Sequence, residues 1–140
     1  MKDKKPLHRY FSILEGDEKA RYLLCGNLQD KVEEAKKIME CCHFCERRCN
    51  VNRLIGDVGY CRVLEPRISS EFIHIGEEPE LVPSHTIFFA GCTFRCVYCQ
   101  NWDISQHPGR GSYIKPGDLA RLIESRTARN VNWVGGEPTP

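Results

Sequence analysis

The sequence lacks a long apolar segment and lacks the features of a secretory signal. Its longest apolar run has about six residues, near Thr86–Gly91, whereas a membrane-spanning helix needs roughly 18 or more. The first residues are polar and basic, without the apolar stretch of a signal peptide. We therefore expect a cytoplasmic protein, in a reducing compartment where disulfides are rare.

An excess of charge of one sign is also missing. The 140 residues include 20 Lys and Arg against 19 Asp and Glu, so the formal net charge is +1. A nucleic-acid or membrane surface usually shows a basic excess, and we expect neither partner. Apolar residues make up 41% of the chain, which is enough for a modest core.

Cysteine, by contrast, is abundant, and most of it is clustered. The chain has nine cysteines, an odd number, and in a reducing compartment such clusters more often bind metal than form disulfides. Cys25 stands alone and is expected to be a small core residue. The others form two groups, which are Cys41, Cys42, Cys45, Cys49 and Cys61, followed by Cys92, Cys96 and Cys99.

The hydrophobic pattern predicts an α/β fold. Short helices are expected between residues 7 and 24, a longer helix over 28–39, and a strand over Ile68–Ile75. The apolar run that ends at Gly91 predicts a buried strand. A helix opening at Pro116 and a second strand, Val131–Val134, follow it. Strand, helix and strand make one right-handed βαβ unit, so the loops after both strands should open on the same sheet edge.

Each of these loops carries a motif. Cys92, Cys96 and Cys99 have the spacing C-x3-C-x2-C. Three thiolates can hold three irons of an iron–sulfur cluster and leave the fourth open, whereas most clusters use four cysteines. The turn Gly135–Pro138 reads Gly-Gly-Glu-Pro. Its glycines allow close approach of the backbone to a ligand, and its carbonyls and Glu137 can accept hydrogen bonds from an ammonium group.

These motifs resemble the radical S-adenosylmethionine (radical SAM) enzymes. The resemblance implies a 4Fe-4S cluster on the three cysteines, with S-adenosylmethionine on its fourth iron, and reductive cleavage to a 5′-deoxyadenosyl radical. It also implies that Tyr98 packs the adenine and that Gly135, Gly136 and Glu137 contact the amino group. The run Phe88–Cys92, with Asn101 after the last cysteine, resembles the pyruvate formate-lyase activating enzyme branch. That branch implies an external electron donor and a protein substrate of the glycyl-radical type.

The first cysteine group predicts a separate metal site. Cys42, Cys45, Cys49 and Cys61 have the spacing C-x2-C-x3-C-x11-C, and four thiolates suit either zinc or an iron–sulfur cluster. Cys41 is a competing ligand, and His43 could replace one thiolate. This segment resembles the N-terminal part of uncharacterised activating-enzyme-like proteins, and its metal stays open.

The expected architecture is a helical, cysteine-rich segment over residues 1–66, followed over 67–140 by the start of a partial (β/α) barrel. The barrel of the resembled family has about six strand–helix units, so the chain is expected to be the N-terminal part of a longer protein. No catalytic side chain or substrate can be named from it. The alternative functions are a ferredoxin-like electron carrier and an interaction module held together by zinc.

Overall fold

The structure, a computed structural model, describes residues 7–138 and forms two compact units, which divide between Ala35 and Lys36. The first unit contains α1 (His8–Leu14), η1 (Arg21–Leu24) and the start of α2 (Leu28–Glu40), and these helices bury none of their residues. The cysteine-rich loop belongs to the second unit, together with the sheet. The domain boundary after residue 66 that the sequence suggests stays a prediction.

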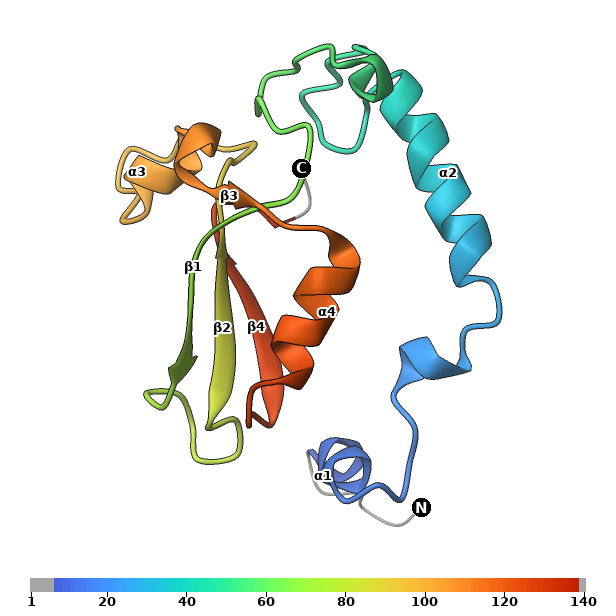
Figure 1. Ribbon diagram of the computed structural model, residues 1–140, viewed down its shortest axis with the longest axis vertical. Helices are drawn as coiled ribbons and strands as arrows, with labels where there is room; N and C mark the ends of the chain where they lie inside the picture. Colours follow the sequence, from blue (N-terminus) through green and yellow to red (C-terminus); the bar gives the residue numbers. More distant parts are fainter. Residues whose placement is uncertain (1–6, 139–140) are drawn as a thin grey trace. The chain divides into compact units, whose positions relative to one another are not determined.

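The second unit is built on a four-stranded sheet in the order β3-β1-β2-β4 (Figure 1). The strands are β1 (Arg67–His74), β2 (Ser84–Phe89), β3 (Ser112–Tyr113) and β4 (Asn130–Gly135). β1 runs antiparallel to β2 and β3, whereas β2 and β4 are parallel. The α/β class is thereby confirmed, although residues 7–138 form an open sheet and no barrel.

The predicted βαβ unit is confirmed as β2, α4 (Pro116–Glu124) and β4. Aromatic and β-branched residues favour β2 as a strand, and its Ile87 is fully buried. Pro116 occupies the first turn of α4, where its missing N–H costs nothing. The expected apolar face of this helix is half-buried in the structure and consists of Leu119, Leu122 and Ile123. Among the described residues, no helix has both the length and the apolar character needed to cross a lipid bilayer.

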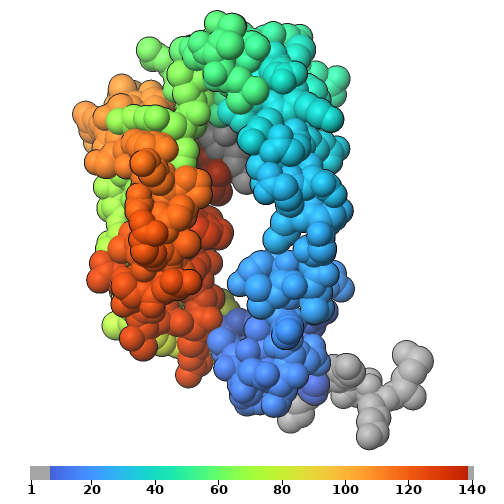
Figure 2. Space-filling view, turned by 45° about the vertical axis from the view of Figure 1, so that its right-hand side comes forward, coloured from blue at the N-terminus to red at the C-terminus, as the bar shows by residue number. Residues whose placement is uncertain are grey.

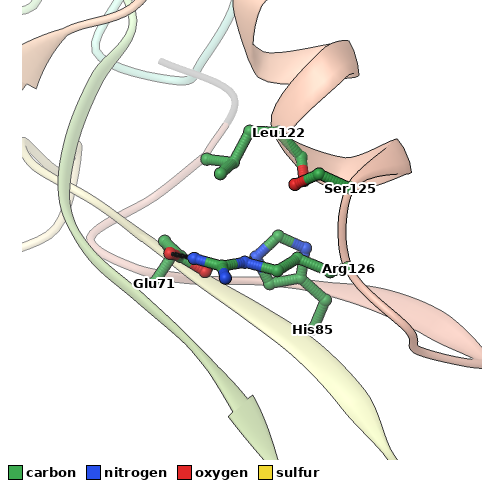
Figure 3. A network of polar contacts seen from close by, with 5 residues as sticks. All are labelled: Glu71, His85, Leu122, Ser125 and Arg126. Carbon is green, nitrogen blue, oxygen red and sulfur yellow. Dashed lines mark hydrogen bonds and ion pairs between the residues drawn. The ribbon is translucent and has the colours of Figure 1, made fainter.

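A partly buried polar network lies between this helix and the sheet. Figure 3 shows Glu71 of β1 facing both His85 of β2 and Arg126, which follows α4, with Leu122 above them. His85 is fully buried and its Nε2 lies 2.7 Å from Glu71 Oε2, while Arg126 pairs with Oε1 of the same carboxylate. The hydrogen bond from Arg126, helped by that from His85, lowers the pKa of Glu71 below its ordinary value although burial opposes the shift.

We expect Glu71→Gln to lower the free energy of unfolding by about 1–3 kcal/mol at neutral pH, because it leaves His85 and Arg126 without a charged acceptor. The pKa of Glu71 is lowered in the folded state, so its stabilisation is full above its ordinary pKa of 4.5. The stabilisation is lost as the pH falls from there through the folded-state pKa. Urea denaturation at neutral and acidic pH measures both effects.

Asp103→Asn is the control. It breaks the exposed pair with Arg110 and should change stability by less than about 1 kcal/mol. Equal losses in the two variants would contradict the assigned role of Glu71.

Candidate functional site

The carboxyl ends of β2 and β4 meet, as the sequence predicts. Phe89 lies opposite Gly135 in the parallel register, and the turn after β4 is hydrogen-bonded to the end of β2. Gly136 N–H donates to the Phe89 carbonyl at 2.9 Å, and Glu137 N–H donates to the Gly91 carbonyl at 3.0 Å. The Gly-Gly-Glu-Pro turn therefore lies directly against the residue that precedes Cys92.

Glycine is required in this turn by the approach of the two chains. A Cβ built on Gly136 would lie 1.7 Å from the Gly91 carbonyl oxygen, far inside van der Waals contact. Gly135 has φ +102°, a left-handed conformation that other residues rarely adopt. The sequence suggests that these glycines leave room for a ligand, but at Gly136 the room is filled by the backbone of Gly91.

The second cysteine group lies on a partly exposed loop. Cys92 and Cys99 are half-buried, whereas Cys96 is exposed. Phe94 N–H donates to Cys92 Sγ at 3.3 Å, and Cys99 Sγ lies 3.5 Å from the hydroxyl of Ser105 in α3 (Trp102–Ser105). The loop is held at its start by Gly91, whose N–H donates to the Ile104 carbonyl at 2.9 Å. Its thiols are thus reachable from solvent and anchored on both sides.

The donor set of this loop suits an iron–sulfur cluster. Thiolates are the ligands that such clusters use, and an N–H directed at a cysteine sulfur stabilises its negative charge. Within residues 7–138, however, no three His, Cys, Asp or Glu side chains lie close enough together to hold a metal ion. Metal binding commonly orders the ligands that it joins. The three thiols suit a cluster because they are the right donor type and are reachable from solvent.

Tyr98 and its neighbour Val97 project from the cysteine loop. Tyr98 is 85% exposed, so its ring face is free to stack against a planar ligand. Asn101, two residues after Cys99, donates from Nδ2 to the Gly135 carbonyl at 3.2 Å. This hydrogen bond is a second connection between the cysteine loop and the Gly-Gly-Glu-Pro turn, and the sequence does not reveal it.

The side chain of Glu137 lies in a different pocket. That pocket is lined by Glu137 together with Arg53, Arg67 and the end of β2, and none of the three cysteines of the second group lines it. Arg67 also donates from Nε to the Gly111 carbonyl at 2.9 Å. This hydrogen bond joins the start of β1 to the segment before β3, and Figure 2 shows the light green residues leading into β1 beside the orange segment around α3 and β3. Glu137 therefore contacts the base of the cysteine loop through its backbone N–H, while it lines a pocket that none of the three cysteines shares.

A groove runs along the sheet face that is turned away from His85. Thr86 and Phe88 alternate with His85 along β2 and so point to this opposite face. The groove extends to Asn101, next to the cysteine loop. At its other end His74 Nδ1 lies 2.6 Å from Glu77 Oε2, and the hydrogen bond from His74 lowers the pKa of Glu77. Glu77 lies in the connection between β1 and β2, and the sequence alone does not show this pairing.

The first cysteine group converges on one pocket. The pocket is lined by all four predicted ligands, Cys42, Cys45, Cys49 and Cys61. Cys41 and His43, the two alternatives left open by the sequence, do not line it. Cys41 is exposed and its Sγ donates to Asn50 Oδ1 at 3.6 Å, while His43 Nδ1 lies 2.6 Å from the Cys41 carbonyl. The structure therefore favours the spacing C-x2-C-x3-C-x11-C over a site that contains Cys41.

Comparison with known families bears on the second half of the chain. Residues 86–140 match the family model described as the Radical SAM superfamily. The matched segment is similar to radical SAM proteins. It contains both motifs, the three-cysteine loop and the Gly-Gly-Glu-Pro turn, and the β2–α4–β4 unit that joins them. Proteins of that superfamily carry a 4Fe-4S cluster and use S-adenosylmethionine together with a reductant. The match therefore suggests an enzyme.

Two curated relatives come from Methanocaldococcus jannaschii. "Uncharacterized protein MJ0674" is 53% identical over 123 residues, which covers 81% of this chain and 36% of that protein. "Uncharacterized protein MJ0808" is 32% identical over 119 residues, covering 70% of this chain and 35% of that protein. The chain thus spans about a third of the length of these relatives. No solved structure gives a significant match.

Proposed function

We propose that this protein cleaves S-adenosylmethionine reductively, with Cys92, Cys96 and Cys99 as the ligands of a 4Fe-4S cluster. When bound, the cluster supplies the electron that breaks a carbon–sulfur bond of the sulfonium and yields methionine and a 5′-deoxyadenosyl radical. The coarse assignment rests on the radical SAM match of residues 86–140. The residue assignment rests on the geometry of the two loops.

The observation that carries the residue assignment is the direct hydrogen bonding between the cysteine loop and the Gly-Gly-Glu-Pro turn. Gly136 and Glu137 donate to carbonyls at the base of the cysteine loop, and Asn101 donates back to Gly135. A ligand that touches the cysteine loop is thereby presented with the backbone of the turn as well. This arrangement supports a site in which the two motifs act on one molecule.

Within this site the residues of the chain have distinct roles. The ring of Tyr98 stacks against the adenine, since an exposed aromatic face suits a nucleobase. The turn residues Gly135, Gly136 and Glu137 orient the amino group, with their backbone held in place by Phe89 and Gly91. The groove on the adjoining sheet face, which starts at Asn101, is a suitable place for the substrate.

We also propose that the protein is of the activating-enzyme type, with an external electron donor and a glycyl-radical-type protein as substrate. The support is the run Phe88–Cys92 followed by Asn101 after the last cysteine. A second 4Fe-4S cluster or a zinc ion is proposed for the N-terminal cysteines.

Electron paramagnetic resonance of the purified, anaerobically reconstituted and reduced protein tests the function. Adding S-adenosylmethionine should change the cluster signal, and 5′-deoxyadenosine should accumulate under strong reductant. Tyr98→Leu should raise the apparent Kd for S-adenosylmethionine about tenfold, which corresponds to roughly 1.4 kcal/mol of lost stacking.

Val97→Ala is the matched control, because Val97 is fully exposed on the same loop and should leave the Kd unchanged. A cluster signal that ignores S-adenosylmethionine, with no 5′-deoxyadenosine formed, would refute the proposal and favour an electron carrier. Equal affinities in the Tyr98 and Val97 variants would remove Tyr98 from the site.

A further inference from the structure

The pocket of the N-terminal cysteines is lined by enough thiols for a complete metal site. In the part of the chain that the structure describes, no three of them lie close enough together to hold a metal ion, and metal binding would draw them together. The four cysteines, Cys42, Cys45, Cys49 and Cys61, line one small space. Cys42 is 7% exposed, and Cys49 Sγ accepts the N–H of Tyr60 at 3.3 Å. Four thiolates from one loop complete either an iron–sulfur cluster or a tetrahedral zinc site.

Positive charge is built into this pocket. Arg53 is 6% exposed and its Nη1 lies 3.9 Å from Cys42 Sγ, and Arg47 lines the same space. A neutral thiol gains little from a buried guanidinium, whereas a thiolate or a thiolate-bound centre is stabilised by it. The pocket is therefore electrostatically suited to a negatively charged, thiolate-bound centre.

The same pocket touches the second cysteine loop. Thr93, the residue after Cys92, lines it and is 6% exposed. Arg47 Nε donates to the Thr93 carbonyl at 3.3 Å. The ring of Tyr60 contacts two guanidinium groups, at 4.0 Å from Arg47 and at 5.0 Å from Arg95. Cations this close to a ring are attracted to its face, so these contacts bring the two cysteine loops together.

The contacting residues are the sequence neighbours of ligands on both sides. Arg47 stands between Cys45 and Cys49, and Tyr60 precedes Cys61. Thr93 and Arg95 stand between Cys92 and Cys96. Two centres held by these loops would consequently be separated by only a few side chains, an arrangement that a purely structural zinc site would not need.

We propose that Cys42, Cys45, Cys49 and Cys61 hold a second 4Fe-4S cluster, which passes single electrons to the cluster of Cys92, Cys96 and Cys99. The electron transfer rests on the proposed function, whereas the second site does not. An external low-potential one-electron donor, dithionite in the laboratory, reduces the N-terminal cluster by one electron. That cluster is reoxidised as the other is reduced, and no covalent bond is made or broken in the transfer.

Metal analysis of the reconstituted protein tests the site by comparing two neighbouring cysteines, Cys42 inside the pocket and Cys41 outside it. Cys42→Ala should lose about half of the iron and sulfide, since one of two 4Fe-4S clusters is lost. Cys41→Ala, the matched control outside the pocket, should retain all of it. Zinc in place of iron, or equal iron in these two variants, would overturn the proposal.

Magnetic coupling tests the electron path without measuring turnover. Two nearby reduced clusters broaden and split each other's paramagnetic resonance signals, and we expect this interaction in the fully reduced protein. It should disappear in Cys42→Ala. With limiting dithionite, the Cys92 cluster should also be reduced more slowly in Cys42→Ala than in Cys41→Ala. Two clusters without magnetic interaction, or equal reduction rates, would overturn the electron transfer.

The triple variant Cys92→Ala, Cys96→Ala, Cys99→Ala separates this proposal from the proposed function. It should keep about half of the iron, held by the N-terminal cysteines, and this result stands even if Cys42→Ala fails to fold. A triple variant without iron would overturn the second cluster. A wild-type protein with two clusters and no response to S-adenosylmethionine would overturn the function and leave the second site intact.

Discussion

Replacing Cys96 by Ala should abolish the cleavage of S-adenosylmethionine and remove about half of the iron, that of one of the two proposed clusters. Cys96 is the exposed member of its group and is not part of the core. Its loss should therefore leave the sheet folded, so that the missing cluster explains the missing activity. Iron and sulfide analysis, paramagnetic resonance and chromatographic detection of 5′-deoxyadenosine measure the effect.

Cys25→Ala is the control for this experiment, because Cys25 lies outside both cysteine groups. It should retain the full iron content, the response to S-adenosylmethionine and the cleavage activity. A Cys96→Ala protein with the iron content and spectrum of its parent would refute the assignment of this loop as a cluster site.

Gly136→Ala should destabilise the protein by about 3 kcal/mol or more, at the upper end of what overpacking usually costs. The new methyl group would lie 1.7 Å from the Gly91 carbonyl oxygen, a backbone atom that cannot rotate away. Because Gly91 precedes Cys92, moving it apart from the turn should also disturb the cysteine loop. We expect a lower melting temperature and reduced cluster incorporation together.

Gly109→Ala provides the matched comparison. A Cβ at Gly109 would have no heavy atom within 4 Å, and its backbone is not in the left-handed region. This variant should keep the stability and the iron of the parent. A Gly136→Ala protein that loses affinity for S-adenosylmethionine while keeping both stability and iron would instead show that the space belongs to the ligand.

The parts of the fold that depend on local pattern were predictable. A short apolar run marks β2, a proline and an apolar stripe mark α4, and their order implies parallel pairing with β4. The strand expected over Ile68–Ile75 is present as β1, shifted by one residue. Its antiparallel pairing with β2 was not predictable, because the connection is long and contains two prolines instead of a tight hairpin turn.

The candidate site shows the same division. The spacing of the cysteines predicts that they are ligands, but the choice between Cys41 and Cys42 depends on which side chain turns into the pocket. Sequence spacing likewise cannot show that Arg47 and Tyr60 contact the second loop, since Arg47 and Thr93 are 46 positions apart in the chain. Contacts between distant loops are decided by the packing of the whole unit.

The hydrogen bonds between the turn and the cysteine loop make two backbone amides into internal reporters. The amide protons of Gly136 and Glu137 are held by the carbonyls of Phe89 and Gly91, so they exchange with solvent only when the two loops separate. Their exchange rates follow the opening of this joint at single-residue resolution. Deuterium exchange of these two amides needs neither iron nor anaerobic conditions, so it can follow the opening of this joint in the protein as purified.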